Sequence, residues 1–193
     1  MEYDLSRRQF LRLGAGDVMR GLLRRKEEGD EAAVPPIRPP GALRGEEEFL
    51  ATCERCGKCA EACPFDVIAL LSPAAGRAEG TPVLNPEETP CRWCDTWDCI
   101  HACPSGALSI TDGAQPAPIA KVELRLDLCL TTQGVLCDTC THYCPPAARA
   151  LTMNGREPRL DVDRCTGCGL CIQHCEATPT AFRIKPTAYP VKK

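Results

Sequence analysis

The chain repeats one cysteine-rich unit four times, and this repetition restricts its possible folds more than any other feature of the sequence. Cysteine accounts for 16 of the 193 residues, and every cysteine falls within a repeat. The four repeats contain Cys53, Cys56, Cys59 and Cys63; Cys91, Cys94, Cys99 and Cys103; Cys129, Cys137, Cys140 and Cys144; and Cys165, Cys168, Cys171 and Cys175. In the first three repeats a proline follows the last cysteine, which favours an extended chain leaving the repeat.

The spacing of these cysteines is typical of proteins that bind [4Fe–4S] clusters. The first and fourth repeats read C-x2-C-x2-C-x3-C. Three cysteines spaced in this way can wrap three iron corners of one cube, and the backbone N–H groups of the loop then face its sulfurs. The second repeat has four residues between its second and third cysteines, and the third has seven between its first and second. We therefore expect up to four clusters; for the third repeat, a degenerate or unoccupied site is the alternative.

Two other uses of cysteine fit this pattern less well. A disulfide framework needs an oxidising compartment, and cysteines this close together would pair locally and leave the repeat unexplained. Structural zinc usually takes two C-x2-C pairs separated by a longer finger, whereas two of these repeats place three cysteines within seven residues. Iron–sulfur clusters account for the spacing best.

The fourth cysteine of each repeat is expected to serve the neighbouring repeat, because two-cluster ferredoxins exchange this ligand. The exchange defines four groups of ligands. Group one is Cys53, Cys56, Cys59 and Cys103; group two is Cys63, Cys91, Cys94 and Cys99; group three is Cys129, Cys137, Cys140 and Cys175; and group four is Cys144, Cys165, Cys168 and Cys171. Groups one and two would then form one dicluster module, and groups three and four a second.

The predicted fold is α+β, with two tandem bacterial-type dicluster ferredoxin modules made of short hairpins and helices around the clusters. We place a basic amphipathic arm at residues 1–30, a proline-rich linker at 31–48, the first module at 49–112 and the second at 122–187. The linker should be extended and hold the arm away from the modules. Apolar stretches at 67–71, 107–110 and 150–153 should pack on the clusters as short helices or strands.

Composition argues against several classes of protein. A net charge of −3 does not suit a wholly basic nucleic-acid-binding protein, and an aromatic content of 5% does not suit base stacking. The longest apolar run, residues 67–71, is far shorter than the roughly 20 residues of a membrane-spanning helix. No nucleophile–base pair, phosphate-binding glycine loop or flavin motif is visible. We therefore expect no nucleic-acid partner, no membrane span and no catalytic site, so that the chain is not an enzyme by itself.

The N-terminal arm is strongly basic. Residues 6–26 carry seven lysines or arginines against one acid, a net charge of +6, and their apolar residues recur at helical spacing. The opening Ser6-Arg7-Arg8 is similar to a twin-arginine export signal, but Asp17 and Arg20 interrupt the apolar run that such a signal needs. We expect a docking helix for a partner protein; a solvated basic arm and a true export signal are the alternatives.

Five further residues lie inside the repeats. His101, His142 and His174 all fall between a third and a fourth cysteine. They could donate hydrogen bonds to cluster sulfur, but we expect exposed polar positions in a short helical turn. Trp93 and Trp97 flank the second cysteine of repeat two, and we expect them to keep water away from a cluster rather than to form a docking patch.

Taken together, these residues resemble the ferredoxin-type NapF proteins of the periplasmic nitrate reductase system. The matching segments are D-x-S-R-R-x-F-L-R at 4–12, R-P-P-G at 38–41, F-L-x-x-C-x-x-C at 49–56, D-x-C-L at 127–130 before the seven-residue gap, and L-x-x-D-x-C-x-G-C-G at 160–169. The sequence departs from the pattern in the longer gap of repeat two and in Glu176, which replaces the final proline.

The resemblance implies a cytoplasmic iron–sulfur protein whose sixteen cysteines are the cluster ligands. Its partner would be the catalytic subunit of a periplasmic nitrate reductase. The protein would act on this subunit before export, in its maturation, by delivering electrons or clusters. The alternative function is an electron-transfer polyferredoxin subunit of a redox complex.

Overall fold

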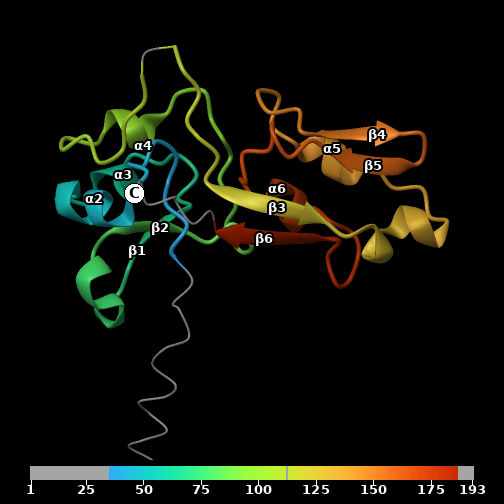
Figure 1. Ribbon diagram of the computed structural model, residues 1–193, viewed down its shortest axis with the longest axis horizontal. Coiled ribbons are helices and arrows are strands. Elements are labelled where there is room, and N and C mark those ends of the chain that lie inside the picture. Colours follow the sequence, from blue (N-terminus) through green and yellow to red (C-terminus); the bar gives the residue numbers. More distant parts are fainter. Residues whose placement is uncertain (1–34, 112, 187–193) are drawn as a thin grey trace, which may run out of the picture. The chain divides into compact units, whose positions relative to one another are not determined.

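The computed structural model describes residues 35–111 and 113–186, which form short helices and two-stranded antiparallel sheets (Figure 1). The chain divides after Val34 into two units, and the predicted arm at 1–30 falls in the first, outside the described residues. The second unit contains all four repeats in two modules. The expected α+β fold is confirmed. Among the described residues, no helix is long and apolar enough to cross a membrane.

The first module places a hairpin between the first two repeats. Its elements are α2 (Glu46–Thr52), α3 (Lys58–Glu61), β1 (Ile68–Leu70), the 3-10 helix η1 (Pro73–Ala78), β2 (Pro82–Leu84) and α4 (Asp98–His101). β1 and β2 are antiparallel, with Ile68 opposite Leu84, and both of these side chains are buried. The hairpin returns the chain to its starting point, so that α3 of repeat one packs against α4 of repeat two.

The second module follows the same plan. Its elements are β3 (Ala120–Leu124), the 3-10 helices η2 (Leu126–Leu128) and η3 (Leu130–Gln133), α5 (Thr139–Tyr143), β4 (Leu151–Asn154), β5 (Glu157–Leu160), α6 (Leu170–Gln173) and β6 (Phe182–Pro186). The β4–β5 hairpin separates repeats three and four, and α5 packs against α6. β3 pairs with β6, with Val122 opposite Ile184, and so joins the first and last segments of the module.

Residues 35–48 differ from expectation, because they pack into the first module instead of forming an extended linker. Ile37 pairs with Leu84, and Ala42 pairs with Leu108, each through an isolated bridge. The second bridge joins the start and the end of the module, as β3 and β6 do in the second module. Proline is tolerated at the edge of a sheet, where no N–H is needed, so this proline-rich segment can pair there. In the sequence alone, the same prolines predict a linker.

Arg38 fastens this segment to the module. Its side chain is fully buried, and its guanidinium donates hydrogen bonds to both carboxylate oxygens of Glu46. It also donates to the Thr81 hydroxyl at 2.9 Å and to the Pro82 carbonyl at 2.7 Å. The guanidinium carbon lies 4.6 Å from the centre of the Phe49 ring, within the range of a cation–π contact. The R-P-P-G segment at 38–41 is therefore a structural clamp.

Candidate metal centres

Two apolar cavities coincide with groups two and four. One is lined by Cys63, Cys91, Cys94 and Cys99, together with Phe65, Ile68, Leu84 and Trp97. The other is lined by Cys144, Cys165, Cys168 and Cys171, together with Val122, Leu151 and Leu170. In each cavity three cysteines come from one repeat and the fourth comes from its neighbour, as the predicted exchange requires. Four thiols around one apolar cavity are a donor set that fits a [4Fe–4S] cube.

Group one is closer to solvent than group two. Its Cys56 is exposed, whereas Cys59 is buried at the start of α3. The pKa of the Cys59 thiol is raised to about 11, chiefly by burial, with the nearby charges of Cys103 and Cys53 contributing. Cys103 belongs to repeat two in the sequence, so its closeness to Cys59 again places a fourth cysteine beside the other repeat.

The seven-residue gap of repeat three does not separate its cysteines. After η3 the chain turns back at Gly134 (φ +84°), and the Val135 N–H donates to the Leu130 carbonyl at 3.1 Å. The thiol neighbours whose charge raises the pKa of Cys140, after burial, are Cys129, Cys137 and Cys175. The four thiols of group three therefore lie near one another, although the gap between Cys129 and Cys137 holds only the short 3-10 helix η3.

Burial raises the pKa of most of the inner thiols. The pKa reaches about 11 for Cys59 and about 12 for Cys91, Cys99 and Cys140, and it is raised also for Cys165, Cys168 and Cys171. Burial is the largest cause in every case, because it penalises the charged thiolate, and neighbouring sulfur charge adds to it. Without a metal centre these thiols stay protonated at neutral pH. Binding of an iron–sulfur core must displace their protons and supply the compensating positive charge.

In repeats two, three and four, the sulfur of the last cysteine accepts a hydrogen bond from a backbone N–H group. The donors are the N–H groups of Leu108 to Cys103 at 3.4 Å, Ala150 to Cys144 at 3.2 Å and Ala181 to Cys175 at 3.4 Å. At Cys103, burial raises the thiol pKa, but the hydrogen bonds from Leu108 and Ser105 outweigh it and lower the pKa overall. Such donors stabilise a thiolate and tune the potential of a bound cluster. They come from the segments after each repeat, where cysteine spacing gives no signal of them.

A shared local conformation explains the longer gap in repeat two. The residue two positions before the third cysteine begins a helix in the left-handed conformation: Gly57 before α3, Trp97 before α4 and Gly169 before α6. The two extra residues of repeat two thus precede this helix start and leave the helix itself unchanged. Asp138 holds the same place before α5 with a negative φ, which sets repeat three apart.

Both tryptophans are buried, as expected of side chains that keep water away from a cluster. Trp93 and Trp97 are 4% and 6% exposed, and their rings meet edge to face with centroids 5.2 Å apart. Trp97 also lines the cavity of group two. Their burial fits a role in excluding water from this cavity.

One of the three histidines differs from expectation. His101 and His142 are exposed, as expected, but His174 is half-buried and stacks on Tyr143, with ring centroids 3.4 Å apart. Its Nε2 atom is buried and has no hydrogen-bond partner among the described residues. The spacing of the cysteines could not indicate this stack, because Tyr143 and His174 belong to different repeats.

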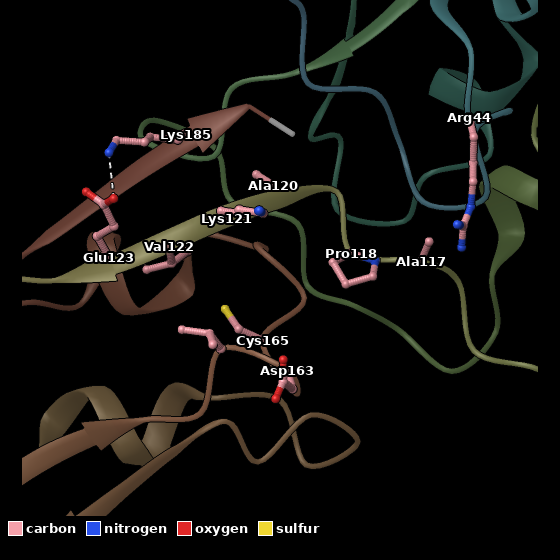
Figure 2. Close-up of a pocket in the computed structure, with 11 residues that line it drawn as sticks. Arg44, Ala117, Pro118, Ala120, Lys121, Val122, Glu123, Asp163, Cys165 and Lys185 are labelled. Carbon is pink, nitrogen blue, oxygen red and sulfur yellow. Dashed lines mark hydrogen bonds and ion pairs between the residues drawn. The ribbon is translucent and has the colours of Figure 1, made fainter. Parts of the chain in front are cut away.

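An open cavity of about 500 Å³ borders group four (Figure 2). Cys165 and the preceding Asp163 line one side of it, and Lys185 of β6 and Glu123 of β3 also line it. Lys185 and Glu123 form an ion pair with each other, as Figure 2 shows. Cys165 is therefore reachable from this cavity, unlike the buried Cys168 and Cys171.

Within the described part of the chain, no three or more His, Cys, Asp or Glu side chains converge closely enough to hold a single metal ion. A structural zinc site needs all of its sulfurs about 2.3 Å from one point. A cube instead binds each thiolate on a separate iron, so its ligands need not converge in this way.

Comparison with known proteins identifies the two modules. A family model described as "4Fe-4S dicluster domain" matches residues 52–107, and a second model with the same description matches residues 121–176. Each match covers one pair of cysteine repeats, and together the two matches support up to four [4Fe–4S] clusters in this chain.

Curated relatives cover most of the chain. The methylamine utilization ferredoxin-type protein MauM of Methylobacillus flagellatus is 35% identical over 181 residues, which cover 89% of this chain and 76% of the relative. The ferredoxin-type protein NapG of Escherichia coli is 34% identical, covering 93% of this chain and 85% of the relative. The ferredoxin-type protein NapF of the same organism is 31% identical, covering 91% and 92%. These matches establish a wider family than NapF alone, and the chain belongs to the ferredoxin-type iron–sulfur electron-transfer proteins with two 4Fe–4S dicluster domains.

Proposed function

We propose that the chain carries single electrons to or from a partner redox enzyme, with its sixteen cysteines holding four [4Fe–4S] clusters in the four groups defined above. A bound cluster supplies the one-electron chemistry. The chain's own residues bury the thiolates, donate N–H groups to sulfur and exclude water. The observation that carries the proposal is the lining of two apolar cavities by four cysteines each, in groups that cross the repeats.

Anaerobic purification and reductive titration test this proposal. The protein should carry about 16 iron atoms and accept roughly four electrons per chain, one for each cube. About 12 iron atoms would show that the third repeat is empty. Stoichiometric zinc without iron would overturn the proposal.

The catalytic subunit of a periplasmic nitrate reductase is the partner that we propose. Support comes from the matches to NapG and NapF and from the resemblance in the sequence. In this role the chain would act in the cytoplasm, on the subunit before its export. The similarity to MauM, whose name refers to methylamine utilization, supports the more general role of an electron-transfer subunit in a redox complex.

Capture of the partner distinguishes these two roles. Full-length tagged chain, isolated from anaerobically grown cells, should retain the immature catalytic subunit, which still carries its leader. Recovery of only the mature, exported subunit, or of a different dehydrogenase, would reject the maturation role and leave the electron-transfer role. Cell fractionation of the same cells gives the compartment directly, and a periplasmic chain whose export fails with Arg7→Lys and Arg8→Lys would make the N-terminal segment an export signal.

We further propose that the chain has no catalytic site of its own. The cavity beside Cys165 carries an ion pair between Lys185 and Glu123, so these two charges engage each other. The loaded protein, supplied with a reduced dye, should leave nitrate unchanged until the catalytic subunit is added. Nitrite formation by the loaded protein alone would contradict this.

A further inference from the structure

Cys91 of group two and Cys168 of group four meet where the two modules come into contact. The Cys91 N–H donates a hydrogen bond to the Cys168 carbonyl oxygen, with a nitrogen–oxygen distance of 3.0 Å. Both residues are buried. Their side chains belong to the same cluster of buried hydrophobic residues. The two ligand groups are therefore neighbours, although they belong to different modules.

The backbone of repeat four has no space for side chains at this contact. A Cβ atom on Gly169 would lie 2.3 Å from the carbonyl oxygen of Pro86, which belongs to the first module. A Cβ atom on Gly167 would lie equally close to the carbonyl oxygen of Ala120, but Ala120 is in β3, so this approach lies within the second module. A real Cβ does not approach an oxygen this closely, so the contact between the modules requires glycine at position 169. Pro86 lies in the segment that leads to Cys91, and this packing holds the segment against repeat four.

Comparison with Gly57 shows that the conformation of the loop is not the only reason for a glycine at position 169. Gly57 holds the equivalent place in repeat one, also begins a helix and has a similar backbone (φ +75° against +89°). A Cβ at Gly57 would meet only the Leu70 Cδ1 at 3.6 Å, an ordinary contact. The conformation demands glycine at both places, but close approach to a second module occurs only at Gly169.

Contacts between helices order the groups within each module. α3, which carries Cys59 of group one, packs against α4, which carries Cys99 of group two. Likewise, α5, which carries Cys140 of group three, packs against α6, which carries Cys171 of group four. Each module thus brings its own two groups together, and Cys91 and Cys168 join groups two and four.

We propose that Gly169 is a positioning residue that holds repeat four against Pro86, so that groups two and four adjoin and the four groups form a line in the order one, two, four, three. This inference rests on the proposed function, because it concerns groups that hold clusters. The line leaves group one, with its exposed Cys56, and group three at its two ends. A partner at one end would then reach the other end only across the contact between Cys91 and Cys168.

Two sets of double variants of the full-length holoprotein test the order. Cys56→Ala with Cys137→Ala removes one ligand from each outer group and leaves groups two and four intact. Cys94→Ala with Cys165→Ala does the reverse. After iron analysis confirms roughly eight atoms in each protein, electron paramagnetic resonance of the reduced samples should show spin–spin splitting in the first and uncoupled signals in the second. Equal splitting in both proteins, or splitting only in the second, would overturn the proposed order.

Gly169→Ala and its matched control Gly57→Ala test the positioning role in a chain with all its cysteines. Both substitutions strain the same loop conformation, but only Gly169→Ala must separate repeat four from Pro86. At equal iron content, Gly169→Ala should weaken the spin interaction between the modules and speed hydrogen exchange of the Cys91 amide, whereas Gly57→Ala should change neither. A protected Cys91 amide and unchanged interaction in Gly169→Ala would refute the role. If the parent protein, without either substitution, held no iron, that result would instead refute the proposed function.

Discussion

Arg38, which has no exposed side-chain surface, forms a two-point ion pair with Glu46 in the first turn of α2. The same guanidinium bonds Thr81 and Pro82, so one side chain joins the entering segment, the helix and the β1–β2 hairpin. A buried charge is tolerated only when it is paired and fully hydrogen-bonded, and Arg38 meets this condition at every nitrogen.

Replacing Arg38 with methionine should therefore destabilise the first module by about 3 kcal/mol, because Glu46 and two acceptors lose their donor. Arg38→Lys should recover little, since an ammonium group cannot form the two-point pair and the other bonds together. The midpoint of urea unfolding of the holoprotein, followed by circular dichroism, measures the change. The control is Arg77→Ala, which breaks the ion pair with Glu47 that is 77% exposed on both sides and should leave the midpoint almost unchanged, because water screens the two charges. Equal effects of the two changes would contradict the role of Arg38.

Two truncations should separate the arm from the module. Removal of residues 1–30 is expected to leave iron content and the visible spectrum unchanged and to abolish binding of the catalytic subunit, because the basic arm is the proposed docking element. Removal of residues 1–43 should also lose iron, since it takes away Ile37 and Arg38, which are buried in the first module. Iron analysis and a pull-down measure the two effects. Loss of iron from the shorter truncation would make the arm a structural part of the module instead.

Substitution of single cysteines should reveal the exchange of ligands. Cys63→Ala changes a residue of repeat one, but it should alter the cluster of group two, because Cys63 lines the cavity with Cys91, Cys94 and Cys99. Its electron paramagnetic resonance spectrum is expected to match that of Cys94→Ala and to differ from that of Cys56→Ala. A match to Cys56→Ala would mean that each repeat keeps its own fourth cysteine.

The raised thiol pKa values predict how the metal-free, reduced chain responds to pH. Unfolded thiols ionise near a pKa of about 8.5, whereas those of Cys59 and Cys91 ionise near 11 and 12 in the folded chain. Their protonated form thus stabilises the fold below about pH 8.5, and this contribution is lost as the pH rises toward 12.

The urea midpoint of the metal-free chain should accordingly fall between pH 8 and pH 10.5. Cys91→Ala with Cys99→Ala should reduce this fall, and the holoprotein should not show it, because its thiolates are already bound. A midpoint that stays constant in the metal-free chain would mean that these thiols are open to water before metal binds.

Residue type and spacing were enough to predict the chemistry of the site. Cysteine is the ligand that clusters require, and spacings of two and three residues dictate which thiols one loop can present, whatever surrounds the loop. The hairpins at β1–β2 and β4–β5 and the grouping of Cys63 with repeat two also follow from this local geometry. The longer gaps in repeats two and three did not affect the prediction of the ligand groups, because the extra residues come before α4 and α5 begin.

The tertiary structure decided what depends on residues far apart in the chain. Residues 35–48 read as a linker because prolines dominate them, yet Arg38 finds its partners at Glu46, Thr81 and Pro82 and so becomes part of the first module. The meeting of Cys91 with Cys168 likewise has no signature in either repeat, because Gly169 looks like any loop glycine until Pro86 packs against it. Short-range spacing fixes which atoms can bind a cluster, whereas the arrangement of the groups is set by packing between segments that only the folded chain brings together.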